Sequence, residues 1–207
     1  MKYYIIAGEA SGDLHGSNLM KGIYAEDPQA EIRFWGGDCM HEVWSRFQNR
    51  ATPLAAGGGA QPEGMGGVVL KPAPDLVESG LVRHYKEGAV MGFVEVLTKA
   101  RKLLGNLSFC KKDIMEWKPD VVILIDYPGF NFKIAEFAHN AGFKVFYYIA
   151  PKVWASREGR IRKLKAHVDK IFIVFPFEKQ YFDSKGISYI YKGNPLVDAV
   201  DGSRAMN

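Results

Sequence analysis

The sequence predicts an α/β fold built on a doubly wound parallel sheet with helices on both faces. Apolar runs of strand length alternate with segments of helical periodicity along the 207 residues, which is typical of βαβ units with right-handed crossovers. The run 121–125 is apolar at every position, as expected of a strand buried between two layers of helices. Hydrophobic residues make up 47% of the chain and charged residues 24%, so we expect one large domain with a sizeable core.

The individual elements follow from the apolar pattern. Continuous or alternating apolar runs predict strands, and apolar residues three and four positions apart predict helices. Leu14, Leu19, Met20 and Ile23 have helical spacing in the first such segment. The predicted strands cover 2–7, 32–36, 121–125, 144–150, 170–175 and 187–192. The predicted helices cover about 13–25, 39–47, 94–117 and 132–141, with shorter helical patterns after residue 150.

Residues 51–74 interrupt this alternation with six glycines and four prolines. So many glycines in a short span resist a fixed backbone, and we interpret the segment as a flexible insertion. A phosphate-binding loop is the less favoured alternative, because no strand and helix frame these glycines at a fixed spacing.

Asp126 is the lone carboxylate directly after the buried run 121–125, and Pro128 and Gly129 end the strand. In open α/β sheets, ligands bind just beyond the carboxyl ends of the strands. Asp126 is therefore a candidate general base held on a rigid edge. The alternative is that Asp126 caps a helix beginning near Asn131, since Asp is a favoured capping residue.

The turn 8–13 follows the first strand and opens the first helix, where α/β proteins present backbone amides to a ligand. Its glycine spacing matches neither a dinucleotide fingerprint nor a Walker loop, so no nucleotide cofactor is predicted. The turn carries Glu9 and Ser11 toward the sheet edge that holds Asp126. The favoured alternative is that Ser11 or Asp13 simply caps the first helix.

Composition narrows the class of protein. A net charge of +4 and a pI near 8.9 favour an anionic partner only weakly. We interpret Cys39 and Cys110 as reduced core thiols of a cytoplasmic protein. No apolar run approaches the roughly 20 residues of a membrane-spanning helix, and the N-terminus lacks a signal-peptide cleavage pattern. The five histidines are scattered, so no metal site is predicted.

Six segments together carry a more specific pattern. They are 8–13 (GEASGD), 90–97 (VMGFVEVL), 118–131 (KPD and IDYPGFN), 149–155 (IAPKVWA), 175–178 (FPFE) and 193–198 (GNPLVD). In this order they resemble the lipid-A-disaccharide synthase family over nearly the whole chain except the glycine-rich stretch. The resemblance implies a Rossmann-like sheet, the N-terminal domain of a two-domain B-type glycosyltransferase.

The resemblance also implies inverting glycosyl transfer in lipopolysaccharide biosynthesis. Diacylglucosamine would pass from UDP-2,3-diacylglucosamine to 2,3-diacylglucosamine 1-phosphate, giving the β-1,6-linked lipid A disaccharide and UDP without a cofactor. Asp126 would take the proton of the attacking 6-hydroxyl, and Glu9 would orient the acceptor. Ser11 and Asn131 are inferred from position alone to bond the sugar; the alternative for both is turn formation.

The acylated substrates of this family give the segment after residue 89 a predicted role. Met91, Phe93 and Val94, followed by an apolar helix face beside several cations, would receive acyl chains or lie among anionic headgroups. A core-facing helix with a solvated basic side is the alternative. Arg157 heads a basic run to 165 that would meet phosphates or be solvated surface. These features predict a peripheral protein on the cytoplasmic face of a Gram-negative inner membrane. Nucleic-acid binding is disfavoured because the sequence has no recognisable nucleic-acid-binding motif.

Three departures limit the resemblance. Gly129 stands where the family usually has an acidic residue, and Lys152 replaces a small polar residue. Family members are also nearly twice this length, so we expect residues 1–197 to be the acceptor-binding domain and 198–207 a truncated linker. The UDP-sugar-binding domain would then belong to the same or another polypeptide.

Two other classes of function stay open at this stage. A lipid-binding module without catalysis would keep the acyl-binding surface and make no use of Asp126. A Rossmann-type binder of a soluble nucleotide is more distant, since the six segments argue against it. Acyl-chain length and oligomeric state have no signal in the sequence.

Overall fold

The computed structural model describes residues 1–51, 80–88, 96–153 and 158–195 and confirms the predicted α/β class. Within these residues, seven parallel strands form one sheet in the order β3-β2-β1-β4-β5-β6-β7, the doubly wound Rossmann-like arrangement. The strands are β1 (Lys2–Ala7), β2 (Glu31–Gly36), β3 (Leu81–His84), β4 (Val121–Ile125), β5 (Lys144–Tyr148), β6 (Lys170–Ile173) and β7 (Ile190–Tyr191).

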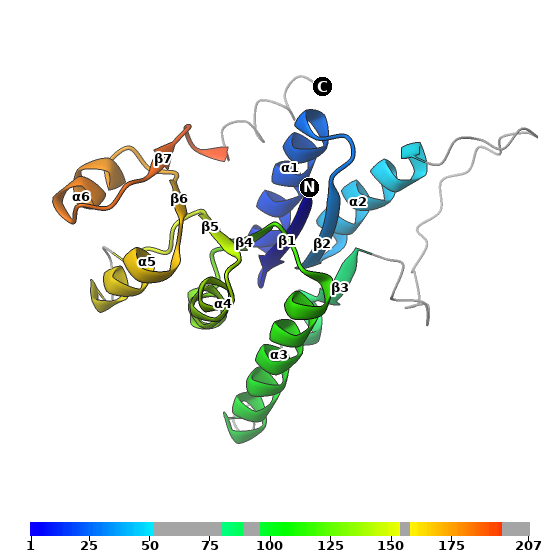
Figure 1. Cartoon of the computed structure of the whole chain (residues 1–207), viewed down its shortest axis with the longest axis horizontal. Helices are drawn as coiled ribbons and strands as arrows, with labels where there is room; N and C mark the ends of the chain where they lie inside the picture. The colour runs from blue at the N-terminus through cyan, green and yellow to red at the C-terminus, as the bar shows by residue number, and fades with distance from the viewer. Residues whose placement is uncertain (52–79, 89–95, 154–157, 196–207) are drawn as a thin grey trace, which may run out of the picture.

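Helices cover both faces of the sheet, as Figure 1 shows. One face packs against α1 (Ala10–Glu26) and α2 (Asp38–Ala51). The other packs against α3 (Val96–Trp117), α4 (Pro128–Asn140), α5 (Ile161–His167) and α6 (Glu178–Ser184). Short 3₁₀ turns, η1 (Tyr85–Gly88) and η3 (Glu158–Arg160), follow β3 and precede α5.

Alternate side chains of the central strands supply two separate cores. In β1, Ile5 and Ala7 belong to the core under α1 and α2, whereas Tyr4 and Ile6 belong to the core under α3 and α4. All five residues of β4 are buried, which is why this strand reads as a continuous apolar run.

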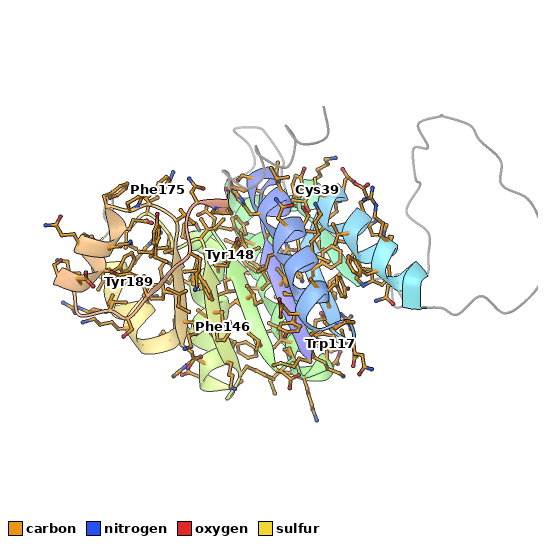
Figure 2. The ribbon with its side chains drawn as sticks, turned by 90° about the horizontal axis from the view of Figure 1, so that it is seen from above. Cys39, Trp117, Phe146, Tyr148, Phe175 and Tyr189 are labelled. Carbon is orange, nitrogen blue, oxygen red and sulfur yellow. The ribbon has the colours of Figure 1, made fainter. Side chains whose placement is uncertain are left out.

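Burial is less complete on one face of β5. Its residues Val145 and Tyr147 are fully buried on the α4 side. On the opposite face Phe146 and Tyr148 are only half-buried, and they pack at the margin of the core beneath α1 and α2 (Figure 2).

Several predicted boundaries were wrong. The first helix begins at Ala10 rather than near residue 13, and α4 begins at Pro128 rather than at 132. Pro128 does not interrupt the helix, because proline is well suited to the first turn, where its missing N–H costs no hydrogen bond. The prediction also missed β3, a four-residue strand at the sheet edge.

Two sequence expectations fall on segments outside the described residues. Only Ala51, at the end of α2, is described from the glycine-rich insertion 51–74, and the linker 198–207 is not described. Among the described residues, no helix combines the length and apolarity needed to cross a membrane.

The prediction that both cysteines lie in the core was right for Cys110 and wrong for Cys39. Cys110 is fully buried on α3, and burial raises the pKa of its thiol. Cys39 is exposed in the first turn of α2.

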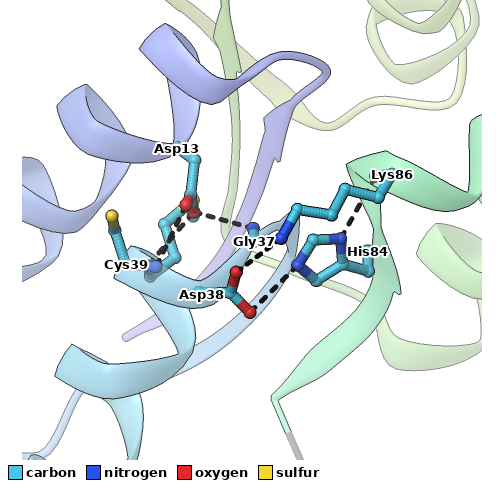
Figure 3. A network of polar contacts seen from close by, with 7 residues as sticks. Asp13, Gly37, Asp38, Cys39, His84 and Lys86 are labelled. Carbon is cyan, nitrogen blue, oxygen red and sulfur yellow. Dashed lines mark hydrogen bonds and ion pairs between the residues drawn. The ribbon is translucent and has the colours of Figure 1, made fainter. Parts of the chain in front are cut away.

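Asp13 ties α1 to the beginning of α2 (Figure 3). Its carboxylate is 2% exposed and accepts hydrogen bonds from the backbone N–H groups of Gly37 (2.7 Å), Cys39 (3.0 Å) and Met40 (3.1 Å). These are orphan amides of the α2 N-terminus, which favours a negative charge. The expectation that Ser11 or Asp13 caps the first helix was therefore wrong: the N-cap of α1 is Glu9, and Asp13 caps a different helix.

We expect Asp13→Ala to lower the free energy of unfolding by about 2 kcal/mol, because three backbone donors lose a buried acceptor. Urea unfolding followed by circular dichroism measures this change. Ser11→Ala, a change at an exposed position of the same helix, is the matched control and should alter stability by less than about 0.5 kcal/mol. Equal effects of the two substitutions would contradict the capping role.

Candidate functional site

The candidate site lies where the strand order reverses, between β1 and β4. Their parallel register pairs Ala7 with Ile125, so the residues that follow each strand emerge side by side. Helices leave these two strands toward opposite faces, which opens a crevice at the carboxyl edge; such switch points are where α/β proteins bind ligands. The structure thus brings the Glu9 turn and the Asp126 turn together at one edge, as predicted.

A cavity of about 320 Å³ opens at this edge, lined by residues of β1, β2, β3, η1 and α3 and by Tyr127 and Phe130, but not by Asp126. Its walls combine aromatic rings with a few polar groups, the usual composition of a small-molecule site. The aromatic rings belong to Trp35, Tyr85, Tyr127 and Phe130. The polar side chains belong to Glu9, Arg83, His84 and Asn106.

The turn after β4 has a strained backbone. Asp126 and Tyr127 have φ angles of 42° and 45°, the left-handed region, which residues with a side chain seldom adopt. Such strain costs on the order of 1–3 kcal/mol a residue and concentrates at functional sites. Gly8 allows this turn to form, because a Cβ there would lie 2.3 Å from the Tyr127 ring.

Two buried side chains hold the backbone of Asp126. The Asn131 amide donates hydrogen bonds to the carbonyl oxygens of Ile125 (3.2 Å) and Asp126 (2.8 Å), and the Tyr147 hydroxyl donates to the same Asp126 carbonyl (2.7 Å). Burial raises the pKa of Tyr147, so this hydroxyl keeps its proton and remains a donor. Asn131 is completely buried, which gives it a positioning role; its predicted bond to the sugar stays a prediction.

The carboxylate of Asp126 is half-buried, and none of the described residues donates a hydrogen bond to it. The capping alternative for Asp126 is not what the structure has, because the N-cap of α4 is Tyr127 and no side chain bonds the helix N-terminus there. The negative charge of Asp126 affects the pKa of two titratable groups, His15 on α1 and Tyr147 on β5. Burial lowers the pKa of His15, and the negative charge of Asp126 partly opposes that shift.

Glu9 and Ser11 occupy different positions despite their proximity in sequence. Glu9 is exposed and lines the cavity, and its charge adds to burial in raising the pKa of Tyr127. Ser11 is exposed in the first turn of α1, outside the cavity wall. A sugar contact by Ser11 stays a prediction.

The remaining predicted substrate residues, Met91, Phe93, Val94 and Arg157, lie outside the described residues. Of the basic run that Arg157 heads, Arg160 lies over the Phe132 ring at 5.5 Å and Lys163 pairs with Glu136 at 3.8 Å. In the part of the chain that the structure describes, no three His, Cys, Asp or Glu side chains are grouped to hold a metal ion.

Sequence reasoning missed the wall of the cavity formed by β3 and η1. Arg83 is half-buried, with its guanidinium carbon 5.7 Å from the ring centre of Trp35 and 5.5 Å from that of Phe109. It also donates a hydrogen bond to the side-chain oxygen of Asn106 on α3. A signal existed in the run Arg83-His84-Tyr85, whose two cationic or titratable groups precede an aromatic ring.

Asp38 fixes this wall from behind (Figure 3). Its carboxylate lies 3.2 Å from Nε2 of His84 and 2.8 Å from Nζ of Lys86, and the hydrogen bond from Lys86 lowers the pKa of Asp38. The backbone N–H of Lys86 donates to Nδ1 of His84 (3.1 Å), which assigns the imidazole proton to Nε2. The network therefore connects β3 and η1 to the N-terminus of α2.

Comparison with known proteins finds relatives in a single enzyme family. A family model described as Lipid-A-disaccharide synthetase matches residues 76–206. Lipid-A-disaccharide synthase of Geobacter metallireducens is 38% identical over 199 residues, which are 96% of this chain and 43% of that protein. The enzyme of Trichlorobacter lovleyi is 34% identical over the same shares. The chain thus spans less than half the length of these relatives.

Solved structures with low sequence identity share the fold. UDP-GlcNAc 2-epimerase from Neisseria meningitidis, bound to UDP-GlcNAc, has a TM-score of 0.59 at 13% identity and aligns with 100% of this chain and 50% of its own. The enzyme from Methanocaldococcus jannaschii has a TM-score of 0.53 at 16% identity, over 96% of this chain and 47% of its own. In both cases, the aligned region covers about half of the solved structure.

We expect Tyr147→Phe to lower the free energy of unfolding by about 1 kcal/mol, because the Asp126 carbonyl loses one of its two side-chain donors. Tyr181→Phe is the matched control. Its hydroxyl is buried without a hydrogen-bond partner among the described residues, so its loss should be neutral or stabilising. Thermal unfolding of both variants measures the difference, and an equal loss in both would remove the positioning role of Tyr147.

Proposed function

The chain belongs to the lipid-A-disaccharide synthase family, and we propose that it provides the acceptor-binding part of that glycosyltransferase. The reaction would transfer diacylglucosamine from UDP-2,3-diacylglucosamine to the 6-hydroxyl of 2,3-diacylglucosamine 1-phosphate. The products would be the β-1,6-linked disaccharide and UDP, in lipid A biosynthesis.

The observation that carries this proposal is the carboxylate of Asp126 on a strained turn at the switch point. Inverting transfer needs a base that takes the proton of the acceptor hydroxyl while its oxygen attacks the anomeric carbon. The oxygen–carbon bond forms as the bond to UDP breaks, and the proton passes to the base. Asp126 would be that base, with Asn131 and Tyr147 keeping its backbone in place.

The cavity suits an amphipathic sugar. The half-buried Tyr85 and Tyr127 rings at the cavity wall offer apolar faces to a pyranose, and Glu9 is placed to accept hydrogen bonds from ring hydroxyls. We propose that Glu9 orients the acceptor so that its 6-hydroxyl reaches Asp126.

The donor would bind outside the region that aligns with the relatives. The relatives extend beyond the aligned region to more than twice its length, and an epimerase with the same fold was solved with UDP-GlcNAc. We propose that residues 1–197 hold the acceptor, that 198–207 begin a linker, and that a second domain of the same or another chain binds the UDP-sugar.

Acylated substrates suggest a peripheral location on the cytoplasmic face of the inner membrane of a Gram-negative bacterium. On α3, Leu107, Cys110 and Ile114 face the core, as the core-facing alternative predicts. Leu104, however, is 60% exposed, and the cation Arg101 is exposed one turn before it. An apolar side chain beside a cation suits a surface with anionic headgroups.

We expect the chain to sediment with vesicles containing anionic phospholipid, and Leu104→Ser to weaken this binding severalfold because less apolar surface enters the bilayer. Phe177→Ser is the matched control: it removes an apolar side chain that is 53% exposed after β6. Equal losses for both variants, or no vesicle binding by the unaltered chain, would argue against the membrane surface on α3.

The catalytic proposal is tested by UDP release from UDP-diacylglucosamine and diacylglucosamine 1-phosphate. The 207-residue chain is assayed with and without a separately produced C-terminal half of a relative. We expect turnover only in the mixture, and we expect Asp126→Asn to lower it about 10²–10⁴-fold, since the base is lost while the shape is kept.

Acceptor binding by the chain alone separates the two candidate functions. If Asp126→Asn keeps acceptor affinity but loses turnover, Asp126 is the base. The other outcome is that the mixture releases no UDP, while the folded chain and its Asp126→Asn variant bind acylated sugar and vesicles equally well. In that case the non-catalytic lipid-binding module is the better account.

A further inference from the structure

We propose that Tyr4 is a positioning residue for the acceptor, held by Asp113 and acting through Trp35 on the aromatic wall of the cavity. Tyr4 lies on β1 and Asp113 on α3, and neither belongs to the six segments that carry the family resemblance. The inference rests on the proposed acceptor-binding function and adds residues that touch no substrate themselves.

The first argument is the complete hydrogen bonding of the Tyr4 hydroxyl. It donates its proton to Oδ2 of Asp113 (2.6 Å), and its oxygen accepts the indole N–H of Trp35 (2.8 Å). The thiol of Cys110 lies 4.0 Å away as a weaker donor. A hydroxyl has one proton and two lone pairs, so these three partners fix its orientation. Burial raises the pKa of Tyr4 well above its ordinary value, so the hydroxyl keeps its proton.

The second argument is the anchoring of Asp113. Its side chain is almost fully buried, and its other oxygen, Oδ1, pairs with the Arg33 guanidinium at 2.7 Å. A buried polar network is costly to break, because each lost bond leaves a polar group without a partner and away from water. The network therefore holds the Tyr4 hydroxyl in place, and with it the edge of the Trp35 indole that carries the N–H.

The third argument is the path of ring contacts from Trp35 to the cavity surface. Trp35 and Phe130 line the cavity but are only 7% and 2% exposed. Their ring centres are 5.5 Å apart, and the Phe130 ring stacks on the half-buried Tyr127 ring, also at 5.5 Å. Trp35 and Phe130 thus support Tyr127, one of the rings proposed above as a face for the sugar. Because protein interiors are close-packed, a ring in such a layer cannot tilt without moving its neighbours.

The consequence is an effect on binding from a residue that the ligand does not reach. Tyr4 is completely buried and is not among the residues that line the cavity. An aromatic face that is already held rigidly loses less conformational entropy when a ligand packs on it. Loss of the Tyr4 hydroxyl leaves the Trp35 N–H without its acceptor, so the rings behind Tyr127 lose their fixed orientation.

The test is a binding titration of the full chain with a short-chain diacylglucosamine 1-phosphate. We expect Tyr4→Phe to weaken binding about three- to tenfold, the effect of roughly one hydrogen bond. Asp113→Asn should weaken it by a similar factor, because the Tyr4 hydroxyl loses its charged acceptor. In a chain that already carries Trp35→Phe, the indole N–H is absent, so Tyr4→Phe should have no further effect on affinity. Additive losses of affinity would overturn the proposal, since Tyr4 would then not act through Trp35.

Asp120→Ala is the matched control. It removes a hydrogen bond of 2.7 Å to the backbone N–H of Lys2, on the same strand as Tyr4 but at the edge away from the cavity. It should lower thermal stability and leave acceptor affinity unchanged. Equal losses of affinity in Asp120→Ala and Tyr4→Phe, or unchanged affinity in Tyr4→Phe, would overturn the positioning role and leave acceptor binding intact. If the unaltered chain does not bind the ligand, the proposed function of the cavity fails and the positioning role fails with it.

Discussion

The parallel pairing of β1 with β4 is the constraint on which the rest of the site depends. Strands β2 and β3 extend the sheet on one side of this pair, and β5, β6 and β7 extend it on the other. The helices that follow β1 and β4 pack on opposite faces of the sheet. The register that pairs Ala7 with Ile125 makes the two following turns neighbours, although more than a hundred residues separate them in sequence. A one-residue shift of this register would exchange the faces of one strand and bury the wrong side chains. The packing of two cores thus holds the geometry of the crevice.

The strained turn after β4 is stable only because three different elements support it. Gly8 after β1 leaves room for the Tyr127 ring, Asn131 comes from α4, and Tyr147 comes from β5. Backbone strain of this kind persists where the surroundings over-determine a conformation. The carboxylate of Asp126 is therefore positioned by the central sheet rather than by the flexibility of a loop.

The prediction of the fold succeeded where neighbouring residues determine an element, and it failed where residues distant in sequence determine it. Strands β1 and β4 were predicted with their observed bounds, because a buried strand appears in the sequence as a run of apolar residues. The start of α4 was misplaced because Pro128 was interpreted as a residue that ends a strand, whereas proline is also favoured in the first turn of a helix. The edge strand β3 has only two apolar residues, too few for a pattern, and Arg83 was missed with it. Proximity across strands that are distant in sequence has no local signal.

The three carboxylates near this edge show how environment divides chemically equal groups. Asp13 is buried, and three backbone amides bind both of its oxygens, so its charge stabilises the N-terminus of α2 and is unavailable to a ligand. Glu9, four residues earlier, is exposed at the cavity wall, where it can accept hydrogen bonds but is well solvated. Asp126 is half-buried, and its carboxylate, unlike its backbone carbonyl, accepts no hydrogen bond from the described residues. A motif that contains two acids thus supplies a structural cap and a residue of the cavity wall, whereas the proposed base follows the neighbouring strand. The sequence already separates Asp126 from the other two by its position after a buried strand, but it does not show that Asp13 caps α2 rather than α1, because the amides that Asp13 binds are distant in sequence.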